Sequence, residues 1–159
     1  MSIPWVLLLL RAISLLLVGL YSGGVFFTVI APSVRRLPGD AYVRHWQAQN
    51  TDYRRAMPVL VIGGLVATLA AGVLSLGRGT AVVVLTMAAA VLVAGTIVIT
   101  LKLLDPLNRA ADAWNPSSLP DGWEAARALW QRWHLFRTVL AVTAFVCLLL
   151  AQMLDHRSG

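Results

Sequence analysis

The stretch TAVVVLTMAAAVLVAGTIVITLKLL, Thr80 to Leu104, is apolar on every side and decides the fold class. It carries no charged residue before Lys102 and shows no alternation of polar and apolar residues, so it predicts a helix rather than a strand. A helix that is apolar all round must face lipid or other apolar helices. About 20 residues, at roughly 1.5 Å each, cross the ~30 Å hydrocarbon core of a bilayer. This stretch is therefore predicted to span a membrane.

Three further apolar stretches have the same character, and they comprise residues 5–31, 57–76 and 135–154. Backbone polar groups find no partners in lipid, which leaves helices or closed barrels, and the lack of alternation favours helices. The composition agrees, because a soluble domain of 159 residues would not be 58% hydrophobic and only 13% charged. We therefore expect an all-α fold, an integral membrane four-helix bundle that forms a single transmembrane domain over residues 1–159.

Four spans place the two polar segments, residues 32–56 and 105–134, on the same side of the membrane. Ten of the 13 basic residues belong to this side, namely Arg35, Arg36, Arg44, Arg54, Arg55, Lys102, Arg109, Arg127, Arg132 and Arg137. The opposite side has Arg78 and Arg157, while Arg11, a short way into the first span, is expected to snorkel to the outer interface. The positive-inside rule then predicts a multi-pass cell-membrane protein with its polar face in the cytoplasm and both termini outside.

The formal net charge of +6 does not indicate nucleic-acid binding, because six acidic residues are interspersed among the bases of the polar side. Anionic headgroups make membrane lipids the simpler partner for these bases. The single cysteine, Cys147, lies deep in the fourth apolar stretch, so the chain forms no internal disulfide. The oligomeric state, including a homo-oligomer, stays open.

Glycines and prolines mark the expected helix ends. Gly77-Arg78-Gly79 predicts a tight hairpin that makes the second and third spans antiparallel neighbours. Pro38-Gly39-Asp40 predicts a turn, with Asp40 capping a helix that runs through Arg55. Pro58 is expected to kink the next junction or to start a new helix, because it has no N–H to donate.

The segment after the third span contains the clearest loop. Asp105-Pro106 is expected to end that span, and residues 115–120 are expected to form the loop. Asp121 followed by Glu124 predicts the start of a final long helix, whose first turns lie outside the apolar zone.

Polar and aromatic residues recur at helical spacing on the polar side. Gln47, Asn50 and Arg54 follow i, i+3, i+7 spacing and share one helix face. A second stripe, on the last helix, consists of Trp130, Trp133, His134 and Arg137. Asn108 and Trp114 lie between the two stripes in sequence, His45 precedes the first, and Tyr21 projects from the first helix toward the bundle core.

Both stripes enter a span from the same side, so they can meet over one mouth of the bundle. Amides, histidines, a boundary arginine and aromatic rings on one face are typical of a pocket for a flat polar-aromatic ligand. We therefore expect one cavity lined by Gln47, Asn50, Asn108, His134 and Arg137. Each member also has a simpler explanation: tryptophans as interfacial anchors, bases as topology signals, and amides as partners of loop carbonyls.

Four short motifs, spread over nearly the whole chain, carry a resemblance to a known family. They are Gly-Leu-Tyr-Ser-Gly-Gly-Val-Phe-Phe (19–27) with Pro32, Gln47-Ala-Gln-Asn50, Asp-Pro106-Leu-Asn108 with Trp114, and Trp130 or Trp133 followed by Arg137-Thr138. In these motifs the sequence resembles the anthrone oxygenase-like family of small four-helix membrane proteins.

The resemblance implies an oxidoreductase, a monooxygenase that acts without a cofactor on a hydrophobic aromatic or polyketide-type substrate. An anthrone has an acidic methylene beside a ketone, and the enolate formed by its deprotonation reacts with dioxygen without metal or flavin. Such an enzyme needs a base, donors for the enolate oxygen and a dry aromatic pocket. The resemblance makes His134, His45 and Arg137 the catalytic candidates, with either histidine as the base, and a substrate that enters from the bilayer.

The resemblance also implies a substrate-binding set. Its members are Gln47, Asn50, Asn108, Trp114, Trp130, Trp133 and Tyr21. Two alternatives remain open at this point. His45 and His134 are candidates to hold a metal or haem, with Asp105 as an obvious third ligand. The polar face is also a candidate surface for another chain, in which case the protein is a non-catalytic membrane partner or assembly protein.

Overall fold

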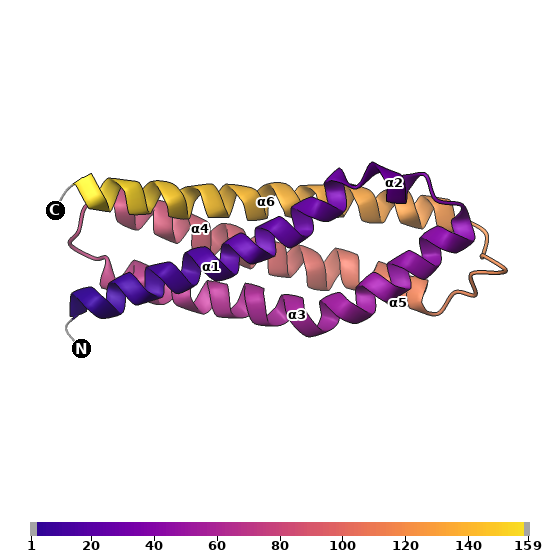
Figure 1. The fold of residues 1–159 in the computed structure, drawn as a ribbon, viewed down its shortest axis with the longest axis horizontal. Coiled ribbons are helices and arrows are strands. Elements are labelled where there is room, and N and C mark those ends of the chain that lie inside the picture. Colours follow the sequence, from indigo (N-terminus) through magenta and orange to yellow (C-terminus); the bar gives the residue numbers. More distant parts are fainter. Residues whose placement is uncertain (1–2, 158–159) are drawn as a thin grey trace.

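The structure, a computed structural model, describes residues 3–157, and these form an elongated bundle of long helices (Figure 1). The four long elements are α1 (Ile3–Ile30), α3 (Gly39–Leu74), α4 (Thr80–Ile99) and α6 (Trp123–Arg157). Within the described residues the only β-type pairing is an isolated bridge between Asn115 and Ser118. Four helices are long and apolar enough to cross a membrane, so the all-α membrane four-helix bundle predicted from the sequence is confirmed.

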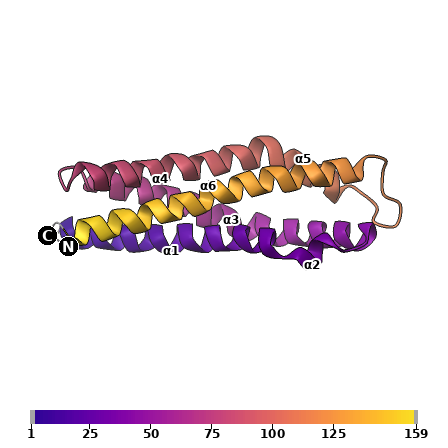
Figure 2. The same ribbon diagram turned by 90° about the horizontal axis from the view of Figure 1, so that it is seen from above.

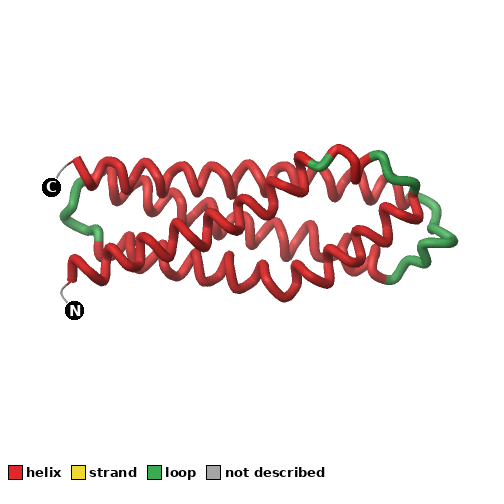
Figure 3. The backbone as a smooth tube through the Cα atoms, viewed as in Figure 1, coloured by secondary structure: helices red, strands yellow, loops and turns green. Residues whose placement is uncertain are grey.

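The described chain begins and ends at the same end of the bundle, next to the connection between α3 and α4 (Figures 1 and 2). Gly77 and Gly79 have φ angles of +92° and +124°, which a residue with a side chain rarely adopts, so they permit the predicted hairpin. The longer loop that follows Asp112 lies at the opposite end, in green in Figure 3. Residues 1–2 and 158–159, the chain ends to which the predicted outside location applies, lie outside the described residues.

Helix α3 runs without a break for 36 residues and passes through Pro58. The expectation that Pro58 starts a new helix is therefore wrong. A proline removes one backbone hydrogen bond, and membrane helices tolerate this where neighbouring helices pack around the site. The predicted turn at residues 38–40 is replaced by a helix start: Pro38 precedes the helix, and Asp40 lies in its first turn.

The third span also continues beyond its predicted end. A π-helical turn, η1 (Thr100–Leu104), follows α4 and leads directly into α5 (Asp105–Asp112). Asp105 N–H bonds to the carbonyl of Thr100, five residues back. In a regular α-helix the Pro106 ring would conflict with the carbonyl four residues earlier, so the wider turn has a steric reason in the sequence. The expectation that Asp105-Pro106 ends the helix is wrong.

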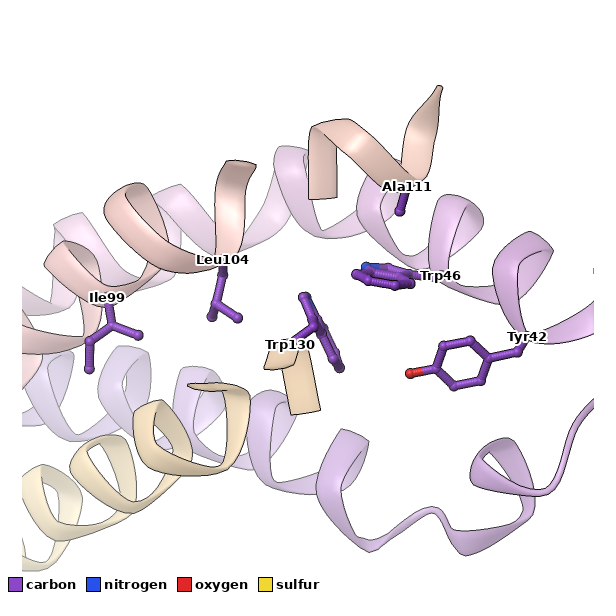
Figure 4. Packing of buried hydrophobic residues seen from close by; sticks show 6 residues of the cluster. All are labelled: Tyr42, Trp46, Ile99, Leu104, Ala111 and Trp130. Atoms are coloured by element: carbon purple, nitrogen blue, oxygen red, sulfur yellow. The ribbon is translucent and has the colours of Figure 1, made fainter. Parts of the chain in front are cut away.

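Two of the long helices are longer than the hydrocarbon core of a bilayer. Helices α3 and α6 have 36 and 35 residues, or roughly 50 Å each, against a hydrocarbon core of about 30 Å. An apolar cluster in the loop half of the bundle includes Trp46, which is only 2% exposed. Figure 4 shows this cluster, whose buried members are Tyr42, Trp46, Ile99, Leu104, Ala111 and Trp130. It places candidate site residues on α3, α5 and α6 next to one another.

Candidate functional site

Asn108 ties two helices together through their tryptophans. Its Oδ1 accepts hydrogen bonds from Trp46 Nε1 at 3.0 Å and from Trp130 Nε1 at 2.8 Å. The Trp46 ring also packs against the ring of Trp114, at a centroid distance of 5.8 Å, and against that of Trp130, at 5.3 Å; Figure 4 shows Trp46 beside Trp130. This α5 side chain therefore fixes α3 against α6, and its position depends on the continuation of the helix past Pro106.

The predicted amide face of α3 fastens α5 in place. Gln47 Nε2 donates to the carbonyls of Ala111 and Trp114, at 2.9 and 3.0 Å. Asn50 Nδ2 donates to Asp112 Oδ1 at 3.1 Å and to the carbonyl of Asn108 at 3.4 Å. These contacts agree with the simpler explanation, in which the amides serve backbone carbonyls rather than a ligand.

We expect Asn108→Ala to lower the free energy of unfolding by about 2–4 kcal/mol, because two buried indole N–H groups lose their acceptor. Asn108→Asp keeps an oxygen at the position and serves as the matched control. Thermal unfolding in detergent, followed by circular dichroism, measures both. Equal loss in the two variants would show that the shared acceptor is not what stabilises the cluster.

His134 is held in one neutral tautomer by its neighbours. A guanidinium has no acceptor, so at 2.7 Å Arg137 Nη2 must donate to His134 Nδ1. Nε2 lies 3.1 Å from the carbonyl of Val25 and therefore carries the proton, which it donates to that oxygen. The ring is 2% exposed and stacks on Trp130 with an interplanar angle of 7°. Both ring nitrogens are thus occupied, and neither offers a lone pair to a substrate in this arrangement.

Arg137 is a buried cation that forms no ion pair with any carboxylate of the described residues. It is only 8% exposed, and its Nη1 donates to Thr100 Oγ1 at 3.1 Å. Its Nε is buried and has no hydrogen-bond partner within the described part of the chain. A charged donor left free in this way is costly in a low-dielectric site unless an anion or polar ligand meets it.

A cavity of about 310 Å³ lies against Arg137, between α3 and α4, and we call it the α3–α4 cavity. It is lined by Tyr21, Tyr53, Arg54, Met57, Pro58, Val61, Ile62, Ile97, Thr100, Leu101, Asp105 and Arg137. Pro58 and the η1 residues Thr100 and Leu101 are among these, so both irregular points of the long helices border it. Irregular turns of this kind are frequent at functional sites of helical proteins.

A second cavity, of about 120 Å³, lies beside α2 (Pro32–Arg35), and we call it the α2 cavity. Among its lining residues are His45, Gln49, Trp130 and His134. Tyr53 lines both cavities, and its hydroxyl lies 3.2 Å from Thr28 Oγ1. The His134–Arg137 pair therefore stands between two separate spaces.

The predicted set does not line one cavity, because its members fall into three groups. Arg137 and Tyr21 border the α3–α4 cavity, whereas His45, His134 and Trp130 border the α2 cavity. The fastening contacts of α5 involve Gln47, Asn50, Asn108 and Trp114. Trp133 borders neither cavity and packs edge-on against Phe136, with centroids 6.2 Å apart. Spacing on one helix correctly predicted that His134 and Arg137 are neighbours, but it did not predict that they border different cavities.

The model of the family described as anthrone oxygenase matches residues 46–147. The chain belongs to the anthrone oxygenase family. No curated protein and no solved structure matches it.

The matched region of this anthrone oxygenase family member contains the wall of the α3–α4 cavity formed by α3, α4, η1, α5 and Arg137. Helix α1, which contributes Tyr21 and the carbonyl of Val25, precedes the match. The predicted set lacks Tyr53 and gives Asp105 only a metal-ligand role, although both line the cavity. Tyr53 lies three residues after Asn50, so helical spacing contained a signal for it. Among residues 3–157 there is no group of three or more histidine, cysteine, aspartate and glutamate side chains suited to a metal.

Proposed function

We propose that this member of the anthrone oxygenase family is a membrane-embedded, cofactor-independent oxygenase acting on a hydrophobic aromatic or polyketide-type substrate. The observation that carries the proposal is that Arg137, a buried cation without a carboxylate partner among the described residues, lines a mostly apolar cavity. An enolate oxygen is an anion that such a donor stabilises most strongly in a site without water. The ketone oxygen of the substrate would lie against Arg137, with its rings between α3 and α4.

The reaction converts a methylene group and dioxygen into a carbonyl group and water. Removal of one methylene proton gives an enolate, which transfers an electron to dioxygen, and recombination then forms a carbon–oxygen bond. The returning proton completes a hydroperoxide, and loss of water from it leaves the carbonyl. The carbon is oxidised by four electrons and dioxygen is reduced by four, so no other oxidant is required.

Asp105 is our candidate for the base. It is the carboxylate that lines the α3–α4 cavity, and one of its oxygens, Oδ2, accepts from Arg109 at 2.5 Å. No described residue donates to Oδ1, which leaves that oxygen available for a substrate proton. His134 fits the base role poorly because Arg137 occupies its lone pair, and His45 lines the other cavity. We instead assign His134 to holding the guanidinium in place through its Nδ1.

Asp105→Asn should lower the rate of oxygen uptake with an anthrone by about 100-fold, the usual range for loss of a general base. An oxygen electrode together with the absorbance of the quinone product gives the rate. Asp52→Asn is the matched control, because Asp52 is exposed on α3 and lines neither cavity. A wild-type rate in Asp105→Asn would remove Asp105 from the mechanism. No uptake by wild type would remove anthrones as the substrate class.

We further propose that the protein lies in the cell membrane with its loop end in the cytoplasm, where most of the basic residues would meet anionic headgroups. The arginines of this end that are exposed, such as Arg44 and Arg55, support this orientation. Labelling of a cysteine introduced at Ser117, in the exposed loop, would test it. If an impermeant reagent labelled this cysteine from outside intact cells, the proposed orientation would be reversed, and the description of the bundle would stay the same.

A further inference from the structure

The lining of the α3–α4 cavity changes in character along the bundle axis. Tyr53, Arg54 and Asp105 border it at the loop end, because α3 starts and α5 ends there (Figure 1). Val61 and Ile97 border it farther along, toward the chain termini. A ligand that fills this space must therefore present polar atoms toward the loop end and apolar atoms toward the middle of the membrane.

The cavity also opens sideways. Ile62 on α3 and Leu101 in η1 both line it, and they are 54% and 62% exposed on the surface of the bundle. Exposed apolar side chains on spanning helices face lipid chains, so this side of the cavity meets the hydrocarbon. Its volume of about 310 Å³ lies at the lower end of the range for small-molecule pockets, which run from about 300 to 1,000 Å³. A ring system can fit inside, whereas a long chain attached to it cannot.

We propose that the natural ligand is a membrane-resident phenol or enol ring that carries a long aliphatic chain. The ring oxygen would bind the guanidinium of Arg137, and the chain would pass between Ile62 and Leu101 into the bilayer. This inference rests on the proposed function and narrows its substrate class. A chain that stays in lipid gains little affinity from the protein, so the structure of the ring decides binding and the chain is tolerated rather than recognised.

The test measures binding without dioxygen chemistry. Two phenols, one with a methyl group and one with a pentadecyl chain at the same ring position, are partitioned between empty nanodiscs and nanodiscs that contain the protein. With concentrations expressed per lipid, we expect wild type to bind both with equal affinity. Arg137→Leu should weaken both by roughly tenfold or more, because a charged hydrogen-bond donor is lost.

Two tryptophan variants then test the opening. Ile62→Trp should weaken the long-chain phenol roughly tenfold more than the methyl compound, because the added ring obstructs the path of the chain. Val91→Trp is the control: Val91 is 69% exposed on α4 and lines neither cavity, so both compounds should bind as to wild type.

Binding of the methyl phenol with exclusion of the long-chain phenol by wild type would overturn the proposal, since the cavity would then be closed. Binding of neither compound, or binding that does not depend on Arg137, would overturn it equally. Oxygen uptake with chain-free anthrones would leave the proposed function standing in all these cases. Arg137-dependent binding of the long-chain phenol without any oxygen uptake would support the ligand class and contradict the oxygenase.

Discussion

Arg137→Leu is expected to lower the rate of oxygen uptake by about 100-fold while leaving the bundle folded. Loss of one charged donor to a developing oxyanion in a dry site removes about 3 kcal/mol of transition-state stabilisation. The effect on folding is small because two contributions oppose each other. Removal of a buried cation that has no carboxylate partner is favourable, whereas His134 Nδ1 and Thr100 Oγ1 lose a donor. We expect the free energy of unfolding to stay within about 2 kcal/mol of wild type.

Arg137→Lys separates charge from geometry. Lysine keeps the positive charge but cannot reproduce the planar guanidinium that holds both His134 and Thr100, so we expect it to lose most of the activity too. Arg132→Leu is the matched control, since Arg132 lies exposed on the same helix. Oxygen uptake and thermal unfolding are measured on the same preparations. Wild-type rates in both Arg137 variants would remove the guanidinium from the chemistry, and a fall in Arg132→Leu would point to a general charge effect.

The elements that depend on local hydropathy could be predicted from the sequence. The spans predicted over residues 5–31, 57–76 and 135–154 fall within α1, α3 and α6 except for residues 31, 75 and 76, because length and apolar composition suffice to identify a lipid-facing helix. The continuation of the third span through η1 into α5 could not be predicted. Asp105-Pro106 has the local pattern of a helix end. The contacts that hold α5 in place come from Gln47 and Asn50 on α3, which is distant in sequence but adjacent in space.

The candidate site shows the same division. Spacing of three residues predicted that His134 and Arg137 lie side by side, and they share a hydrogen bond. The same spacing could not show that the carbonyl of Val25, more than a hundred residues earlier, accepts the Nε2 proton of His134 and fixes the tautomer. Nor could it show that Tyr53 and Asp105 border the cavity that Arg137 faces. Partners across helices depend on tertiary packing, which one-dimensional spacing does not contain.

Arg11 is the clearest case of a partner that the sequence did not reveal. The sequence predicted only that this side chain extends to the outer interface; the structure shows that it pairs with Asp155 on α6 and that its Nη2 donates to Ser75 Oγ at 2.9 Å. The side chains of Arg11 and Asp155 are 10% and 14% exposed, so the pair is nearly buried. Arg78 in the hairpin adds a second, more exposed contact to Asp155 Oδ2 at 3.4 Å. One carboxylate thus joins α1, α6 and the α3–α4 connection.

Asp155→Ala is therefore expected to lower the free energy of unfolding by about 3–5 kcal/mol, because Arg11 keeps its charge and loses its counter-ion in a nearly buried position. The double variant Arg11→Leu with Asp155→Leu should recover most of this loss, since replacing both members of a buried pair by apolar residues is often neutral. Asp52→Ala, at an exposed position of α3, is the control and should unfold like wild type. Unfolding in detergent followed by circular dichroism compares the variants.

If Asp155→Ala unfolded with the wild-type midpoint, the guanidinium of Arg11 would be solvated by water, and the pair would be a surface contact that contributes little to stability. A loss that the double variant did not recover would instead show that Asp155 acts through Arg78 or the packing of α6, because removing the Arg11 charge would then relieve nothing.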